Sequence, residues 1–118
     1  MQELIKAYFS TALFTSIDSL TGNPLDDEFS FSDISEETVQ QTEKDISEFL
    51  NLCAAQGVAW NETNAHKLMH DFWLTRNCHG AGFWDGDYPV WGEKLTAIAH
   101  MFAEVDLYVG DDGKIYHV

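Results

Sequence analysis

The chain has few basic residues, few cysteines and prolines, and no long apolar run. Six lysines and arginines against twenty acids give a net charge of −14, which disfavours direct binding to nucleic acid or to an anionic membrane. The N-terminus lacks the basic region and apolar run of a secretion signal, so we expect a cytoplasmic protein. Cys53 and Cys78 have neither metal-finger nor redox spacing, and we interpret both as reduced thiols.

The residues that are abundant describe one globular domain. Hydrophobic residues make up 45% of the 118 positions, enough for a core that buries roughly two-thirds of the unfolded surface. Apolar residues at helical spacing predict four helices, over about 2–15, 36–56, from a cap at Asn61 or Thr63 to about 77, and over about 91–104. Ser35 and Gly57 suit the start and the end of the second helix.

The C-terminal segment has the pattern of a β-hairpin. Leu107 and Val109 alternate with polar residues, and a two-residue loop at Asp112-Gly113 places Val109 opposite Tyr116 and Leu107 opposite Val118. An isolated hairpin is marginally stable, so we expect it to pack on the helices. The prediction is therefore an α+β fold, a single domain over residues 1–118 with about four helices and a C-terminal β-hairpin.

Acidic residues concentrate in the first half of the chain. Ten carboxylates and one base, Lys44, lie between Asp18 and Glu48, a net charge of −9. One interpretation is a solvated loop followed by the outer face of a helix, and the other is a surface that binds a basic partner. Calcium binding is disfavoured, because residues 26–28 lack the ligand spacing and the central glycine of an EF-hand loop. The predicted partner-binding residues are Asp26, Asp27, Glu28, Asp33, Glu36, Glu37, Glu43, Asp45 and Glu48.

Arg76 is the only arginine of the chain, and it lies in a run of polar and aromatic residues punctuated by glycines. Because the guanidinium pairs bidentately with carboxylates, we expect one or two neighbouring aspartates to neutralise it in a structural cluster. The predicted cluster consists of Asp71, Arg76, Asn77, His79, Asp85 and Asp87. The alternative is a small enzyme or ligand-binding site, in which Arg76 and His79 bind an anion or developing negative charge and Asp85 or Asp87 tunes the histidine.

His66 and His70 are four residues apart on the third predicted helix and would project from one face. Two such imidazoles can share a metal ion, with a third ligand from Asp71, Cys78, His79 or a distant carboxylate. We favour two histidines at the polar margin of a packed helix, and we expect neither a metal nor another cofactor.

The second half of the chain carries a long linear motif. It consists of Asp71-Phe-Trp-Leu-Thr-Arg-Asn77, His79-Gly-Ala-Gly-Phe-Trp-Asp85, Leu95 in a helix, and Asp106-Leu-Tyr-Val-Gly-Asp-Asp-Gly-Lys114. This motif resembles a family of small uncharacterised proteins of bacteriophages, prophages and plasmids. The resemblance covers residues 66–116, and it implies a shared half over residues 61–118 with a helix, a glycine loop, a helix and the hairpin. The acidic, variable-looking residues 1–60 look peculiar to this chain. Cys78 departs from the glycine or variable polar residue expected there.

The resemblance implies an accessory role on a mobile element, in the cytoplasm of a bacterial host. Small acidic proteins of this kind inhibit host or defence proteins, including by nucleic-acid mimicry, as in counter-defence against CRISPR or restriction. We therefore predict a non-enzymatic inhibitor of a basic, nucleic-acid-binding host or defence protein. The alternatives are the small enzyme or ligand-binding domain and a structural virion or assembly protein.

Overall fold

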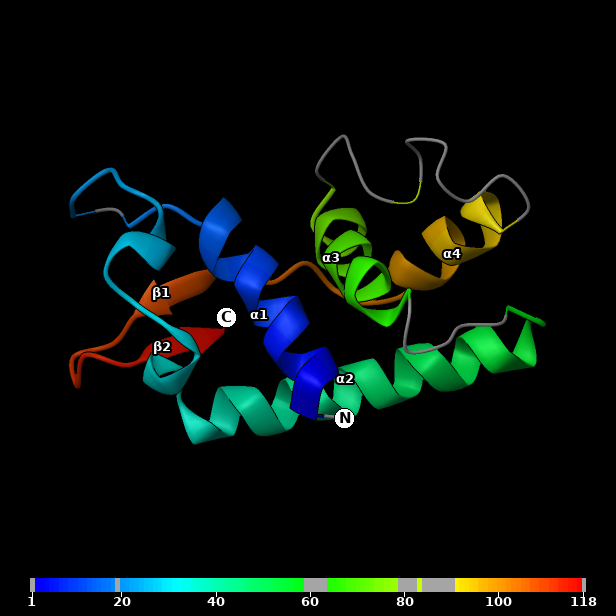
Figure 1. The fold of residues 1–118 in the computed structure, drawn as a ribbon, viewed down its shortest axis with the longest axis horizontal. Helices are drawn as coiled ribbons and strands as arrows, with labels where there is room; N and C mark the ends of the chain where they lie inside the picture. Colours follow the sequence, from blue (N-terminus) through cyan, green and yellow to red (C-terminus); the bar gives the residue numbers. More distant parts are fainter. Residues whose placement is uncertain (1, 19, 59–63, 79–82, 84–90, 118) are drawn as a thin grey trace.

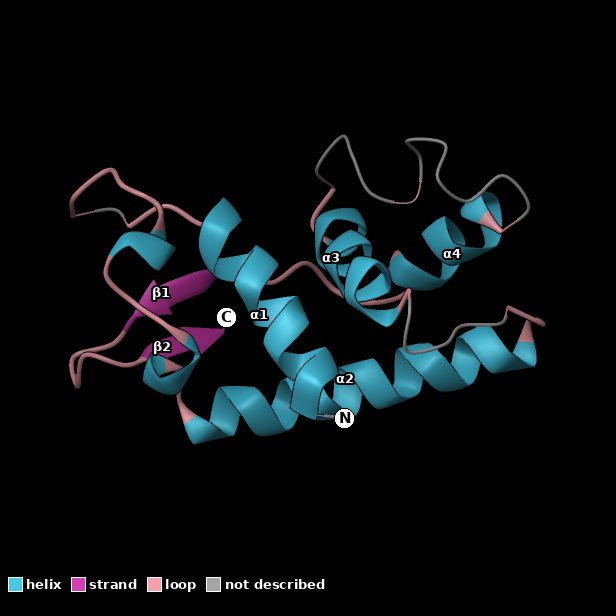
Figure 2. Cartoon of the chain, viewed as in Figure 1, coloured by secondary structure: helices cyan, strands magenta, loops and turns pink. Residues whose placement is uncertain are grey.

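Helices dominate the fold, and a pair of antiparallel strands follows them at the C-terminal end (Figures 1 and 2). The computed structural model describes residues 2–18, 20–58, 64–78, 83 and 91–117. The helices of this part are α1 (Gln2–Thr15), α2 (Glu36–Ala55), α3 (Ala65–Arg76) and α4 (Gly92–Ala99), with the short 3-10 turns η1 (Leu25–Asp27) and η2 (Phe31–Asp33). The strands are β1 (Leu107–Val109) and β2 (Ile115–His117), so the predicted α+β class is confirmed.

Helix α2 begins and ends where its sequence signals predict. The Ser35 hydroxyl accepts a hydrogen bond from the Thr38 amide at 3.2 Å, and Glu36 and Glu37 occupy the electropositive first turn. At the other end Gly57 has φ of 77°, the left-handed conformation that glycine adopts without steric cost.

Helix α4 is shorter than predicted, because it ends at Ala99 and not near residue 104. The amides of Met101 and Phe102 bond to the carbonyls of Ile98 and Ala99, three residues back, so the chain tightens and then leaves the helix. This exit frees the carbonyl of Ala103 to accept hydrogen bonds from Arg76. The apolar spacing alone could not predict that stop.

The predicted register of the hairpin is wrong by one residue. Leu107 pairs with His117, Tyr108 with Tyr116 and Val109 with Ile115. The amide of Gly113 bonds to the Gly110 carbonyl while the Gly110 amide bonds to Lys114, and Gly113 has φ of 79°, which makes a three-residue loop with a glycine bulge. The slip moves Tyr116 to the face of Tyr108, where the two rings stack at 5.7 Å.

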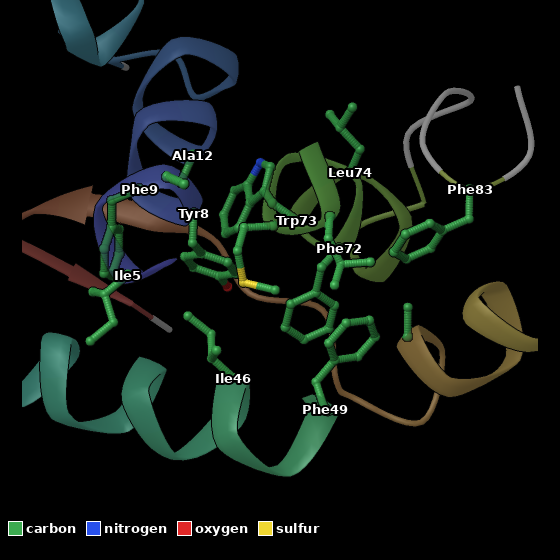
Figure 3. Close-up of a cluster of buried hydrophobic side chains, with 14 of the residues drawn as sticks. Ile5, Tyr8, Phe9, Ala12, Ile46, Phe49, Phe72, Trp73, Leu74 and Phe83 are labelled. Atoms are coloured by element: carbon green, nitrogen blue, oxygen red, sulfur yellow. The ribbon is translucent and has the colours of Figure 1, made fainter. Parts of the chain in front are cut away.

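The core joins both halves of the chain. Figure 1 shows α2 running along one side of the molecule, with α1, α3 and α4 on its other side. Tyr8 of α1, Phe49 of α2 and Phe72 of α3 are fully buried and meet in one cluster with Phe83 (Figure 3). The proposed division into a chain-specific half and a shared half, 1–60 and 61–118, therefore does not coincide with separate cores.

Both cysteines are free thiols, as predicted. Cys53 is buried on the core side of α2, and burial raises its pKa to about 11, which keeps this thiol protonated and unreactive at neutral pH. Cys78 is exposed, and its pKa is raised by the hydrogen bond that its thiol donates to Glu104 at 3.4 Å.

Candidate functional site

Arg76, at the C-terminal end of α3, is 3% exposed and lies at the junction of several elements. Its Nε and Nη2 both donate to the carbonyl oxygen of Ala103, at 3.1 and 2.8 Å. Its Nη1 donates to the Tyr8 hydroxyl of α1 at 3.1 Å and to the Asp45 carboxylate of α2 at 3.0 Å. One guanidinium thus connects α1, α2, α3 and the segment after α4.

The surroundings of Arg76 hold its guanidinium in a fixed position. The guanidinium carbon lies 5.5 Å from the ring centres of both Phe72 and Phe102, within the range of cation–π attraction. Burial raises the pKa of Tyr8 to about 12, and the charge of Arg76 opposes that rise. The Tyr8 hydroxyl therefore remains protonated as part of the same network.

Within the described residues, Arg76 pairs with Asp45 and not with Asp71, the one described residue among the three aspartates that the sequence suggested. Asp71 is 1% exposed, and its two carboxylate oxygens lie 3.3 Å from Lys67 and 3.0 Å from His70, both on its own helix. Asn77, also assigned to the cluster, bonds instead to the Trp73 carbonyl and the Val105 amide, so it caps the end of α3. His79, Asp85 and Asp87 lie outside the described residues.

Asp45 was predicted to bind a partner, but its carboxylate is only 15% exposed and is paired with Arg76, so it is not available to one. The sequence did hold a signal for this position. Residue 45 is three after Thr42 and four before Phe49, both of which are buried, so it borders the core side of α2.

The alternative reading of Arg76 as an anion-binding residue loses its chemical basis. Four hydrogen bonds to Ala103, Tyr8 and Asp45 occupy the guanidinium, which is buried and already neutralised. A substrate anion would have to displace Asp45 from a buried pair, at a cost of several kcal/mol. His79 and Asp85, the other two residues of that reading, lie outside the part of the chain that the structure describes.

His66 and His70 are both exposed on α3. The Nδ1 atom of His70 is 3.0 Å from Asp71, and Lys67 shares that carboxylate. Within the described residues, no three His, Cys, Asp or Glu side chains come close enough together to hold a metal ion. The two histidines therefore have no third metal ligand beside them in this part of the structure.

Most of the predicted partner-binding carboxylates face solvent. Asp33 is an exception, since its carboxylate accepts from the Ser30 amide at 2.8 Å and so caps η2. The other seven are exposed, and within the described residues none of them forms an ion pair: Asp26, Asp27, Glu28, Glu36, Glu37, Glu43 and Glu48.

Four of these carboxylates lie on one side of α2, and we call them the acidic face: Glu36, Glu37, Glu43 and Glu48. Glu43 and Glu48 line a shallow strip along this helix with Lys44. The opposite side of the same helix buries Ile46 and Phe49 in the core. The helix thus presents the acidic face outward on a rigid support.

His117 adds a pH-sensitive contact between β2 and the helices. Its ring packs on Phe9 at 6.5 Å, and its Nε2 atom is buried without a hydrogen-bond partner in the described part of the chain. Its pKa lies below the usual 6.5, chiefly because of burial and further because of the charge of Arg76, while Asp45 acts in the opposite direction. The folded protein therefore holds this imidazole neutral at neutral pH.

We expect acidification to weaken the fold through His117. Below about pH 6.5 the unfolded chain takes up the proton first, so the contribution of His117 is complete above that pH and falls as the pH drops toward the folded pKa. Urea unfolding between pH 7.5 and 5.5 measures the loss. A His117→Gln variant should show a smaller loss, whereas His100→Gln, at an exposed histidine, should match the wild type.

No family model, curated protein or solved structure matches this chain. None of the helices in the described ranges is long and apolar enough to cross a membrane.

Proposed function

We propose that this protein binds a basic protein, of the kind that binds nucleic acid in a bacterial host or defence system, and inhibits it. The observation that carries the proposal is the set of seven exposed carboxylates without an ion-pair partner in the described residues. Together with a net charge of −14, they create a field that steers lysine- and arginine-rich surfaces toward α2 and the turns before it.

The density of charge on α2 bears on how such inhibition works. The helix has 20 residues and is about 30 Å long, a length over which one DNA strand carries about nine phosphates. The acidic face has four carboxylates, and Lys44 lies among them. The helix is therefore negatively charged like a nucleic-acid strand, but at less than half its charge density. This favours inhibition by electrostatic steering of the partner and steric block of its binding site over a one-to-one match of carboxylates to phosphates.

The rest of the acidic set widens this surface. Asp26, Asp27 and Glu28 lie at η1, outside α2, and are exposed. A counter-defence role, and with it the phage, prophage or plasmid origin, remains the interpretation drawn from the linear motif of residues 66–116. The acidic set supports binding to a basic protein whatever that origin.

The test is capture of a partner from bacterial lysate followed by affinity measurements on the purified pair. Reversing three charges of the acidic face should weaken binding at least about tenfold, because each favourable pair becomes a repulsive one. Raising the salt concentration should weaken binding of the wild type more than that of the variant. The variant carries Glu37→Lys, Glu43→Lys and Glu48→Lys.

A matched variant changes the net charge equally at exposed acids that lie outside α2. It carries Glu3→Lys, Glu93→Lys and Asp111→Lys, two of them also in first helical turns. This control should keep most of the affinity. Equal losses in the two variants would show that only net charge matters, and unchanged binding by the acidic-face variant would refute the proposal.

A further inference from the structure

Within the described residues, one edge of strand β1 pairs with β2 and the other edge has no partner. The bond from the Gly110 amide to the Lys114 carbonyl fixes the ladder, so Tyr108 exchanges bonds with Tyr116 while Leu107 and Val109 turn their amides and carbonyls away from β2. None of these four backbone groups has a hydrogen-bond partner within the described residues.

The opposite edge of the sheet differs from this one. There the outward carbonyl of Ile115 accepts from the Ser35 amide at 2.9 Å, and the outward amide of His117 donates to the Thr38 hydroxyl at 3.3 Å. The start of α2 thus covers the edge of β2. The edge of β1 is the one on which a further strand can add.

Two hollows lie beside this edge and share Ile17 and Leu107. The first has a volume of about 510 Å³ and reaches from Trp73 and Asn77 along the segment that leads into β1. The second has a volume of about 170 Å³ and continues past Leu107 to Val109. Together they form a groove along the free edge of β1.

The walls of this groove expose apolar side chains. Leu20 is 90% exposed, Ile17 is 58% exposed and Tyr108 is 47% exposed, and all three line the second hollow. Large apolar side chains that gather beside a free strand edge mark an interaction site more strongly than single exposed residues do. Phe14 and Met101, also exposed, are absent from the lining of both hollows.

The rim of the groove is acidic. Glu104 and Asp106 line the first hollow and Asp18 lines the second, and among the described residues neither lining includes a lysine or an arginine. This charge complements a basic segment. It disfavours a second copy of the chain, since each copy carries −14 and would bring its own acids to the same place.

We propose that the free edge of β1 and the adjoining groove bind an extended segment of another protein, with alternating apolar and basic residues, which adds to the sheet as a strand. Alternate residues of the segment bond to the amides and carbonyls of Leu107 and Val109. Its apolar side chains pack against Ile17 and Leu20, and its basic side chains face Asp18 and Asp106. The residues of this site differ from those of the acidic face of α2, although Tyr108 also lines a hollow with Glu37 of that face. The proposal holds whether or not the acidic face binds a protein.

The test uses the full chain as bait for a library of random twelve-residue peptides presented by mRNA display. The enriched peptides should share alternating apolar and basic residues. A synthetic copy of the strongest one should bind one-to-one and shift the amide NMR signals of Leu107 and Val109 more than those of α2. Failure to enrich any peptide, or shifts confined to other parts of the chain, would overturn the proposal.

Two variants separate backbone pairing from side-chain packing. Val109→Pro removes an outward amide that the β1–β2 ladder does not use, so it should weaken binding of the synthetic peptide at least about tenfold. Val109→Thr, its control, keeps the amide and the branched shape of the side chain. The double variant Ile17→Ser/Leu20→Ser changes exposed positions only and should weaken binding similarly. Met101→Ser, an exposed apolar position away from the groove, serves as its control.

Two results would contradict the binding of a segment of another protein at the edge of β1. If the peptide binds Val109→Pro and the serine variant as tightly as the wild type, the groove is not its site. If sedimentation shows that the wild-type chain dimerises and Val109→Pro is monomeric, the occupant of the edge is a second copy. Either result refutes this proposal and leaves binding at the acidic face of α2 to its own test.

Discussion

Replacing Arg76 with methionine should lower the free energy of unfolding by about 3–5 kcal/mol, the cost of removing one partner from a buried ion pair. The loss leaves the Asp45 carboxylate without its cation and removes the donors from the Tyr8 hydroxyl and the Ala103 carbonyl. Since small domains are stable by about 5–15 kcal/mol, this single change removes a large share of the total. Chemical denaturation followed by tryptophan fluorescence measures it.

A double variant separates the ion pair from the rest of the network. Arg76→Met combined with Asp45→Leu removes both charges, so its cost should be smaller than the sum of the two single costs by about 1–3 kcal/mol. Lys44→Met, at an exposed lysine of α2, should change stability by less than about 0.5 kcal/mol. A cost below about 1 kcal/mol for Arg76→Met would mean that this network contributes little to folding.

The Arg76 network shows where prediction from the sequence reaches its limit. A lone arginine among aromatics and carboxylates predicted a structural cluster, and its burial agrees with that expectation. The partner could not be predicted from nearness along the chain, because Asp45 is separated from it by 31 positions and Asp71 by only five. The choice depends on how α2 and α3 pack, and Asp71 already has Lys67 and His70 on its own helix.

The helices and the hairpin show the same division between local and distant causes. The start and the end of α2 depend on Ser35 and Gly57, whose effects are local, and both were predicted correctly. Helix α4 ends at Ala99, which leaves the Ala103 carbonyl free to bond to Arg76, 27 positions away, and this end was predicted too late. The hairpin register depends on whether Gly113 closes a two-residue loop or a bulge, a choice that the residue types alone leave open.

The acidic segment was predicted as one set, yet the structure divides it into residues with different tasks. Asp45 belongs to the core network, and Asp33 caps η2. The carboxylates of the acidic face remain exposed because they occupy the side of α2 opposite Ile46 and Phe49. Helical periodicity thus identifies which acids are available to a partner, whereas their number along the sequence does not.

Shortening Phe49 to alanine should cost about 3–5 kcal/mol of folding free energy, the range observed for large-to-small changes of buried aromatic residues. Phe49 is 0% exposed and stacks on Phe72 at 4.1 Å between ring centres, with an angle of 14° between the ring planes. Its ring centre also lies 6.1 Å from that of Phe83 and 6.3 Å from that of Phe102. The ring thus connects α2 with α3 and with the segments on either side of α4.

The position of Phe49 makes this variant a test of whether the two halves of the chain fold together. The acidic half contributes this ring, and the second half contributes its neighbours. Phe49→Ala should therefore lower the stability of both halves together, in one cooperative unfolding transition. Far-ultraviolet circular dichroism and tryptophan fluorescence should report that transition at the same denaturant concentration. Phe49→Leu, which keeps much of the buried volume, should cost less, and Phe14→Ala, at a 66% exposed ring, should cost under about 0.5 kcal/mol. Two separate transitions in the wild type would show instead that residues 64–117 hold their fold without α2, so that the acidic face is carried by an independently folding segment.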